Sequence, residues 1–328
     1  MKKNFTYIDL FAGIGGFRSA LTKLGGKCLY TNEWDKYSRQ TYSAWYGEDE
    51  VSNEDIREVN HKKIPSHDIL CAGFPCQPFS LAGVSKKQSL GRAHGFDDEL
   101  QGNLFFSIMS IVDAKRPKVL FLENVKNLKS HDKGNTWKVI KNEIEKRNYV
   151  LFDNVINAKY WVPQSRERVF MIAFDRKIYG KTINFSFPKK MQKVKMLKEI
   201  LENNPDPKYT LSDKLWSYLY QYKIKQQKKG NGFGYGLFEG QETARTMSAR
   251  YYKDGAEILI KQKNKNPRRL TAKESMLIMG FDTSYSKLFK HKNGFPQVVS
   301  DTQAYKQFGN SVVPKVVESI GKKILEIL

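Results

Sequence analysis

The chain has 328 residues, 40% of them hydrophobic, which is enough for a substantial core in one large domain or in a large and a small one. Asp9 and three glycines interrupt the apolar stretch near the N-terminus, which argues against a signal peptide, and no run approaches the roughly 18 apolar residues of a membrane span. The three cysteines contain no CxxC pair, which argues against a disulfide framework or a structural zinc site and predicts a cytoplasmic protein.

The net charge is strongly positive. Lys and Arg number 56 against 34 Asp and Glu, which gives +22 and a pI of about 9.6. Residues 189–229 contain eleven lysines and four acidic residues, and residues 261–292 contain nine basic and two acidic residues. Lysines that only keep a protein soluble would not need to gather in the C-terminal half. The distribution therefore favours a polyanionic partner such as a nucleic acid.

Apolar runs that predict strands alternate with amphipathic runs that predict helices in the first half of the chain. Strands are expected at residues 6–11, 27–32, 68–74 and 118–124. Helices are expected between them at residues 17–24, 36–46 and 104–115. This alternation is typical of βαβ units, so the predicted fold class is α/β with a doubly wound, mostly parallel sheet.

The alternation of predicted strands and helices ends near Phe187. Two more predicted strands, residues 151–158 and 168–174, precede this point, and a Lys-rich stretch with a cluster of glycines follows it. The last sixteen residues again have the spacing of an amphipathic helix. The sequence therefore predicts a first domain at residues 1–187, a smaller irregular domain at 188–292 and a C-terminal segment, 293–328, that packs back on the first domain.

A glycine turn follows the first predicted strand and contains Gly13, Gly15 and Gly16. Glycines at such a turn let a ligand approach the end of a parallel strand, although tight turns also need glycine for packing alone. Glu33 follows the next strand, where a carboxylate can bind ribose hydroxyls, and Asp55 is a candidate partner for an adenine amino group. Two interpretations are open for Trp34: its ring covers an adenine, or it packs in the hydrophobic core. The spacing is not GxGxxG, which counts against NAD and leaves other adenosine cofactors open.

Cys76 lies in GFPCQPFS, directly after the third predicted strand of the first domain. Its position predicts a place at the carboxyl end of the sheet, where ligands bind in open α/β folds. Pro75 and Pro78 stiffen the backbone around it. Free cysteines are usually inert and buried, which is the interpretation for Cys28 and Cys71, but the polar and proline neighbours of Cys76 favour a nucleophile.

Three further polar side chains are expected near this edge. Glu123 ends an apolar strand and becomes a candidate acid or base once it lies beside Cys76. Arg166 and Arg168 alternate with Gln164 along the start of a strand, so the two arginines share a face that suits a carboxylate or phosphate clamp. A surface salt bridge is the alternative for either arginine.

Together, these motifs resemble the cytosine-5 DNA methyltransferases of bacterial restriction-modification systems. The ordered series FAGIGG, NEWD, GFPCQPFS, ENV, QSRER, RRLTAKESMLIMGF and QFGNSV covers nearly the whole chain. The resemblance implies an S-adenosylmethionine-dependent, Rossmann-like catalytic domain, with the irregular domain at 188–292 as the target-recognition domain. It also implies the reaction: methyl transfer to C5 of a flipped-out cytosine in a short duplex DNA sequence, through a Cys76–C6 adduct. The implied role is the protection of host DNA.

The resemblance assigns roles to individual residues. In the implied catalytic group, Cys76 is the nucleophile, Glu123 binds the base and Arg168 holds it. Arg166 and Gln164 support these residues. The implied cofactor pocket is Phe11, Gly13, Gly15, Glu33, Trp34, Asp55, Ile56, Pro75, Leu104 and Asn310. The implied DNA contacts are Gln77, Ser80, Arg245, Thr246, Arg250, Tyr251 and Tyr252. The expected product is S-adenosylhomocysteine, and no metal is expected to take part. The protein is expected to be a monomer that binds neither its cognate endonuclease stably nor a membrane.

Three other functions stay open at this point. A relative within the same family methylates tRNA with the same catalytic set, although the basic small domain favours duplex DNA. A dinucleotide oxidoreductase would explain the glycine turn but not PCQ, ENV or QSRER. A non-catalytic DNA-binding protein would explain only the charge.

Overall fold

The structure is a computed structural model that describes residues 4–47, 51–75, 104–189, 193–286 and 297–328. The strands are β1 Phe5–Leu10, β2 Gly26–Asn32, β3 Val51–Ser52, β4 Ile69–Gly73, β5 Val119–Val125, β6 Tyr149–Asn157, β7 Glu167–Asp175, β8 Leu237–Phe238, β9 Leu259–Gln262 and β10 Lys265–Arg269. The helices are α1 Gly16–Lys23, α2 Lys36–Tyr46, α5 Leu104–Lys115, α6 Asn135–Lys146, α7 Arg176–Tyr179, α8 Asp213–Lys228, α9 Ala272–Ile278, α10 Thr283–Ser286, α11 Asp301–Asn310 and α12 Pro314–Leu325. No helix in these ranges is long and apolar enough to cross a membrane.

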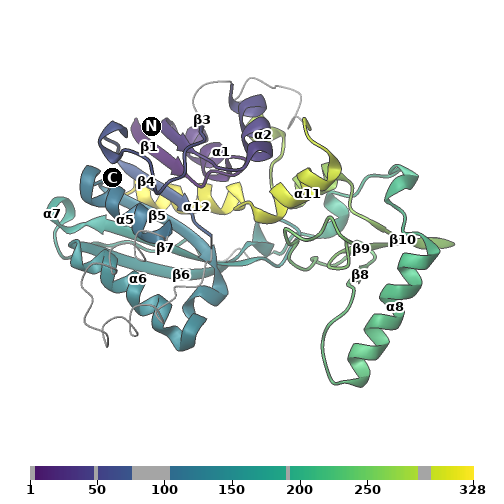
Figure 1. The fold of residues 1–328 in the computed structure, drawn as a ribbon. Coiled ribbons are helices and arrows are strands. Elements are labelled where there is room, and N and C mark those ends of the chain that lie inside the picture. Colours follow the sequence, from purple (N-terminus) through teal and green to yellow (C-terminus); the bar gives the residue numbers. More distant parts are fainter. Residues whose placement is uncertain (1–3, 48–50, 76–103, 190–192, 287–296) are drawn as a thin grey trace.

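A seven-stranded sheet forms the centre of the molecule, in the order β3-β2-β1-β4-β5-β7-β6 (Figure 1). All of its pairs are parallel except those of β7, which runs antiparallel to both β5 and β6. The chain moves outward from β1 to β3 and then returns to β4, so the strand order reverses between β1 and β4. The prediction of a doubly wound, mostly parallel α/β sheet is confirmed, and its crevice lies at this reversal.

Alternate residues of each strand face opposite sides of the sheet and build two core layers. Tyr7, Cys71 and Phe121 pack with α1 and α12, whereas Leu70 and Leu120 pack with α5 and α6. This arrangement buries the strands on both sides, which explains their nearly continuous apolar runs. Cys71 is fully buried, and burial raises the pKa of its thiol well above the ordinary value, so it is the inert cysteine that its sequence context predicts.

A smaller sheet, β10-β9-β8, lies beyond the large one, and α8 extends from it away from the rest of the molecule (Figure 1). The region was predicted to be irregular, yet α8 is a helix of 16 residues. Its pattern is hard to recognise because Leu219 is its one buried residue. The hydrophobic cluster of the large sheet extends to Met247 and Tyr251, so the two parts share a continuous core.

The C-terminal helix α12 covers α1. Val316, Val317 and Ile320 are buried there, and a side chain at Gly321 would come within 2.7 Å of Leu24. An ion pair of 3.0 Å between Lys23 and Glu318 joins the same two helices at the surface. The two ends of the chain therefore pack together on one face of the sheet.

Replacing Ile320 with alanine should lower the free energy of unfolding by about 2–5 kcal/mol, because the fully buried side chain leaves a cavity between α12 and α1. Urea denaturation followed by circular dichroism measures the loss. Lys322→Ala, which removes an exposed ion pair on the same helix, is the control and should change stability by at most about 1 kcal/mol. Equal losses in the two variants would contradict the packing described here.

Candidate active site

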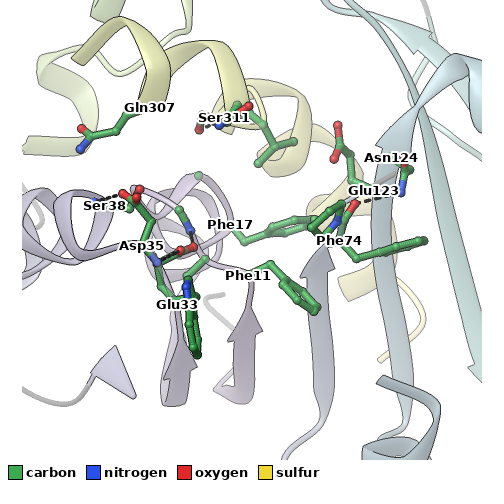
Figure 2. A pocket seen from close by; sticks show the side chains of 18 of the residues that line it. Phe11, Phe17, Glu33, Asp35, Ser38, Phe74, Glu123, Asn124, Gln307 and Ser311 are labelled. Atoms are coloured by element: carbon green, nitrogen blue, oxygen red, sulfur yellow. Dashed lines mark hydrogen bonds between the residues drawn. The ribbon is translucent and has the colours of Figure 1, made fainter. Parts of the chain in front are cut away.

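A cavity of about 740 Å³ lies at the carboxyl edge of the large sheet. The ends of β1, β2, β4 and β5, the start of β7 and the end of α11 supply its walls. Figure 2 shows Glu33 and Asp35 at one end, Glu123 and Asn124 at the other, and Phe11 and Phe17 between them. Nine of the ten residues predicted to bind a cofactor line this cavity: Phe11, Gly13, Glu33, Trp34, Asp55, Ile56, Pro75, Leu104 and Asn310.

Glu33 is held rigidly by two backbone amides. Gly13 N–H donates to its Oε2 at 2.7 Å, and Asp35 N–H donates to its Oε1, also at 2.7 Å. Burial raises the pKa of Glu33, whereas the two amide hydrogen bonds lower it. Each carboxylate oxygen keeps a second lone pair, so Glu33 can still accept hydrogen bonds from the hydroxyls of a ligand.

The remaining walls at this end suit a flat, partly apolar ligand. Phe11 has a positive φ of 55°, which is rare for a bulky residue and marks a backbone position fixed by its surroundings. Trp34 is 67% exposed at the rim, so it does not close a core and its ring is free to cover a ligand. Asp55 forms an ion pair with Arg57, whose hydrogen bond lowers the pKa of that carboxyl.

Gly15 requires a correction. It does not line the cavity; its neighbour Gly16 does. A side chain at Gly15 would lie 2.3 Å from the ring of Tyr46, whose hydroxyl donates to the Gly15 carbonyl at 2.6 Å. Its φ of 80° also favours glycine. Gly15 is therefore needed for the turn and for packing, and it lies outside the cavity lining to which it was assigned.

Glu123 and Arg168 form a buried ion pair at the other end of the cavity. The β5–β7 register places Val125 opposite Arg168, and Arg168 Nε lies 3.2 Å from Glu123 Oε1. Because β7 is antiparallel, its first residues, rather than its last, reach the carboxyl edge of the sheet. The two side chains are 11% and 16% exposed, so the pair opens to the cavity but is largely withdrawn from water.

Burial outweighs pairing for both members of this ion pair. It raises the pKa of Glu123 although Arg168 and Arg166 lower it, and it lowers the pKa of Arg168 although Glu123 raises it. Glu123 is therefore easier to protonate than an ordinary glutamate. In its protonated form it can donate one hydrogen bond and accept another.

Asn124 fixes the backbone that leads toward Cys76. Its Nδ2 donates to the Phe74 carbonyl at 2.9 Å, and its Oδ1 accepts from Val125 N–H at 2.8 Å. β4 is thus tied to β5 one residue before Pro75, which lines the cavity. Cys76 lies outside the described residues.

Arg166 is anchored entirely through backbone carbonyls. Its Nη1 donates to Met247 at 2.9 Å, and its Nη2 donates to Gly309 at 2.9 Å and to Ser311 at 2.8 Å. Burial and the nearby Arg168 charge lower its pKa to about 9, which leaves the guanidinium charged at neutral pH. Arg166 lines the cavity and joins β7, residue 247 and the end of α11.

Gln164 does not line the cavity. Its Nε2 donates to the Ile278 carbonyl at 2.8 Å, and its Oε1 accepts from Met247 N–H at 3.1 Å. The side chain is fully buried. Gln164 therefore contacts Met247 and Ile278 rather than the cavity, and its supporting role in catalysis stays a prediction.

The predicted DNA contacts fall into different environments. Arg245 and Arg250 are exposed, and Thr246 and Tyr252 are partly exposed. Tyr251 is fully buried, and its hydroxyl donates to the Ile258 carbonyl at 2.7 Å and accepts from Leu270 N–H at 2.8 Å. The prediction that Tyr251 contacts DNA is therefore wrong. Gln77 and Ser80 lie outside the described residues.

Several residues that line the cavity were assigned no role from the sequence. They include Asn32, whose Nδ2 donates to the Glu54 carbonyl at 2.9 Å, and Gln307, whose Oε1 accepts from Thr41 at 2.9 Å. Asp35 is the N-cap of α2 and accepts from Ser38 N–H at 2.8 Å. Gln307 and Asp35 lie in the motifs QFGNSV and NEWD, so their place in those motifs is the signal that could have identified them.

No group of three or more His, Cys, Asp or Glu side chains in the described ranges could hold a metal ion. The donors present fit an adenosine-type cofactor instead: a carboxylate held by the glycine turn, an exposed indole and a second carboxylate surround one cavity.

A family comparison identifies the chain. Residues 5–326 match the family described as C-5 cytosine-specific DNA methylase. The chain belongs to this family. It is a DNA cytosine-5-methyltransferase, and the use of S-adenosylmethionine follows from membership of a methyltransferase family.

Relatives of the methyltransferase are similar over nearly its full length. The DNA-cytosine methyltransferase of Escherichia coli strain K12 is 44% identical over 97% of this chain and 77% of its own. The type II methyltransferase M1.ScrFI of Lactococcus lactis subsp. cremoris is 45% identical over 99% and 79%. The type II methyltransferase M.HhaI of Haemophilus parahaemolyticus is 40% identical over 97% and 93%.

Solved structures share the fold of the methyltransferase. The Entamoeba histolytica methyltransferase EhMeth superposes with a TM-score of 0.73 and 20% identity, covering 99% of this chain and 98% of its own. A DNMT2 variant from Spodoptera frugiperda superposes with a TM-score of 0.76 and 20% identity, covering 98% and 99%. At this identity the likeness establishes the fold alone.

Gly309→Ala should destabilise the methyltransferase and weaken cofactor binding. The added methyl group would lie 2.3 Å from the Ser248 carbonyl oxygen and 2.4 Å from Ala249 N, and these backbone atoms cannot rotate away. We expect a loss of about 1–3 kcal/mol by urea denaturation and a higher Kd for S-adenosylmethionine by calorimetry. Gly232→Ala is the control, because it has open space around it. Wild-type behaviour of Gly309→Ala would contradict the close contact.

Glu123→Gln should become more stable relative to the wild type as the pH rises. The folded-state pKa of Glu123 lies above the ordinary value of about 4.3, so folding favours its protonated form. Its stabilising contribution is complete below that value and is lost as the pH rises through the folded pKa. Urea denaturation of both proteins between pH 4 and pH 8 measures the difference. A pH-independent difference would mean that Arg168 offsets burial completely.

Proposed function

We propose that the methyltransferase transfers a methyl group from S-adenosylmethionine to C5 of a flipped-out cytosine in a short, specific duplex DNA sequence. The reaction would proceed through a covalent bond between Cys76 and C6 of the base. The observation that carries the proposal is the buried Glu123–Arg168 pair, which opens into the same cavity as Glu33 and Pro75.

Glu123 is suited to bind the reacting face of cytosine. The ring nitrogen N3 accepts a hydrogen bond and the exocyclic amine donates one, so a protonated carboxyl group can bind both. The raised pKa of Glu123 favours this form. Its hydrogen bond to N3 draws electrons from the ring and makes C6 a better electrophile.

Cys76 would add to C6 as a thiolate, and the electrons that it supplies would make C5 a nucleophile. C5 would then form a bond to the methyl group, lose its proton to a base and expel Cys76, which restores the aromatic ring. Arg168 would hold the flipped base against Glu123, and Arg166 would keep Arg168 and the end of α11 in register.

S-adenosylmethionine supplies an electrophilic methyl group on a sulfonium centre. Glu33 would accept hydrogen bonds from its ribose hydroxyls, Trp34 would cover its adenine, and Asp55 would accept from the adenine amine. The remaining pocket residues, from Phe11 to Asn310, would exclude water from the reacting centre. We propose no metal in this reaction, and S-adenosylhomocysteine as its product.

The DNA would lie against the small domain, residues 188–292, where the basic charge is concentrated. Arg245, Arg250, Thr246 and Tyr252 are the candidate contacts there, with Gln77 and Ser80 near the base. Flipping a cytosine costs a few kcal/mol of stacking and pairing, which contacts in the cavity would offset. A monomer is sufficient, because one active site acts on one base.

We also propose that the enzyme protects host DNA from a cognate restriction endonuclease, to which it does not bind stably. The type II relatives support this role through their names. The cytoplasm, where the host DNA lies, is the proposed location.

The first test incubates unmethylated plasmid with the enzyme and S-adenosylmethionine and sequences the DNA after bisulfite conversion. We expect protected cytosines in one short recurring context with the wild type and none with Cys76→Ala. Glu123→Gln should keep the same context at a rate about 10²–10⁴-fold lower, because it cannot transfer a proton.

Parallel samples with tRNA test the alternative substrate. Methylation of tRNA but not of plasmid would replace duplex DNA in this proposal. Failure to bind S-adenosylmethionine in calorimetry would point instead to a different cofactor, and activity retained by Cys76→Ala would exclude the covalent step.

A further inference from the structure

α8 carries a side on which lysines and tyrosines follow one another. Five exposed residues, spaced four, four, three and four positions apart, follow this side, the last of them directly after the end of the helix: Lys214, Tyr218, Tyr222, Lys225 and Lys229. We call them the lysine–tyrosine stripe. This spacing places them along one side of a helix. The other side packs on the small sheet through Leu219, Tyr235 and Leu259.

The lysines of the stripe have no acidic partners within the described ranges. Among the described residues, Lys214, Lys225 and Lys229 form no ion pair, whereas on α6 Lys141 pairs with Glu145 and Lys146 with Glu143. Asp213 is the one acidic residue of α8, and its Oδ1 accepts from Asn266 Nδ2 at 2.6 Å at the helix start. The positive charge of the stripe is therefore uncompensated.

The two tyrosines add hydrogen-bond donors to this charge. Tyr218 is 61% exposed and Tyr222 is 37% exposed. Their rings are stacked, with centroids 6.2 Å apart and an angle of 24° between the planes. In the described part of the chain neither hydroxyl has a hydrogen-bond partner, so both remain available to an acceptor. Lysines and tyrosine hydroxyls together are typical donors to DNA phosphates.

We propose that the lysine–tyrosine stripe binds the phosphate backbone of duplex DNA outside the sequence that the enzyme recognises. This inference rests on the proposed function. A rise of about 1.5 Å per residue makes the stripe roughly 22 Å long, which spans about six base pairs at about 3.4 Å each. Lysine is depleted in protein–protein interfaces, so the charge selects a polyanion over a protein partner.

α8 also has a suitable position for this role. It extends from the small sheet away from the large sheet (Figure 1). The exposed Arg245 and Arg250 lie in loops between β8 and β9. DNA that continues past those loops would meet the helix. Contacts to phosphate contribute affinity and register but do not read bases.

The test measures binding of two duplexes with the same central plasmid sequence, about 12 and about 40 base pairs long, by fluorescence anisotropy in increasing KCl. For the long duplex, a triple variant with Lys214→Gln, Lys225→Gln and Lys229→Gln should have a log–log salt slope shallower by about 2.7, at about 0.9 for each lost phosphate contact. Its binding of the short duplex should match the wild type. Tyr218→Phe with Tyr222→Phe should weaken long-duplex binding without changing the slope.

The control variant carries Lys27→Gln, Lys177→Gln and Lys181→Gln. These exposed lysines follow the amino edge of the sheet, opposite the cavity, so their loss removes the same charge and should preserve the slope. Equal slopes in the stripe and control variants would overturn the proposal. So would a changed sedimentation coefficient of the stripe variant with unchanged DNA binding, because a second copy would then occupy the surface.

The outcomes separate this inference from the proposed function. One outcome is that the wild type does not methylate plasmid, while the stripe variant has a shallower salt slope than the wild type. The stripe is then a DNA contact and the proposed reaction is wrong. If plasmid is methylated and the stripe variant keeps the wild-type slope, the reaction stands and the stripe inference fails.

Discussion

The charge of Arg166 holds the molecule together at the point where its parts meet. A fully buried cation is costly, and here three backbone carbonyls replace water around it. One carbonyl belongs to Met247, and the other two belong to Gly309 at the end of α11 and to Ser311, which follows it. Each part of the chain therefore depends on the others to satisfy one guanidinium, and neither α11 nor residue 247 can shift without exposing it.

The chemistry of the cavity depends on the same constraint. Glu123 and Arg168 face each other because β7 enters the sheet in the reverse direction, and Arg166 fixes where β7 begins. Two effects act in opposite directions on the pKa of Glu123: burial raises it, and the charges of Arg168 and Arg166 lower it.

Much of the fold follows from local patterns. The alternation of strands and helices predicts the parallel sheet, and the motif residues at the strand ends predict most of the cavity. The reversed direction of β7 has no local signal, since strand order is set by long-range packing. Tyr251 was misassigned for the same reason: beside Arg250 it resembles a DNA contact, but its hydroxyl is bound by Ile258 and Leu270.

The site shows the same limit. Alternation placed Arg166 and Arg168 on one face, yet their partners differ, because Arg166 binds carbonyls of residues 247, 309 and 311 that are remote in the sequence. Gln164 likewise binds Met247 and Ile278 rather than the cavity. Every residue type has a backbone carbonyl, so the sequence does not show which residues bind a side chain through their backbone.

The contact of α12 with α1 has a consequence for synthesis. Helix α1 keeps an uncovered apolar face until residues 314–325 have been made, so its half of the core stays open while all the residues between the two helices are translated. β6 must also wait for β7, which inserts between it and β5. The nascent chain is thus exposed to aggregation for longest on that face, and a premature stop codon that removes α12 alone would leave a protein with no closed core.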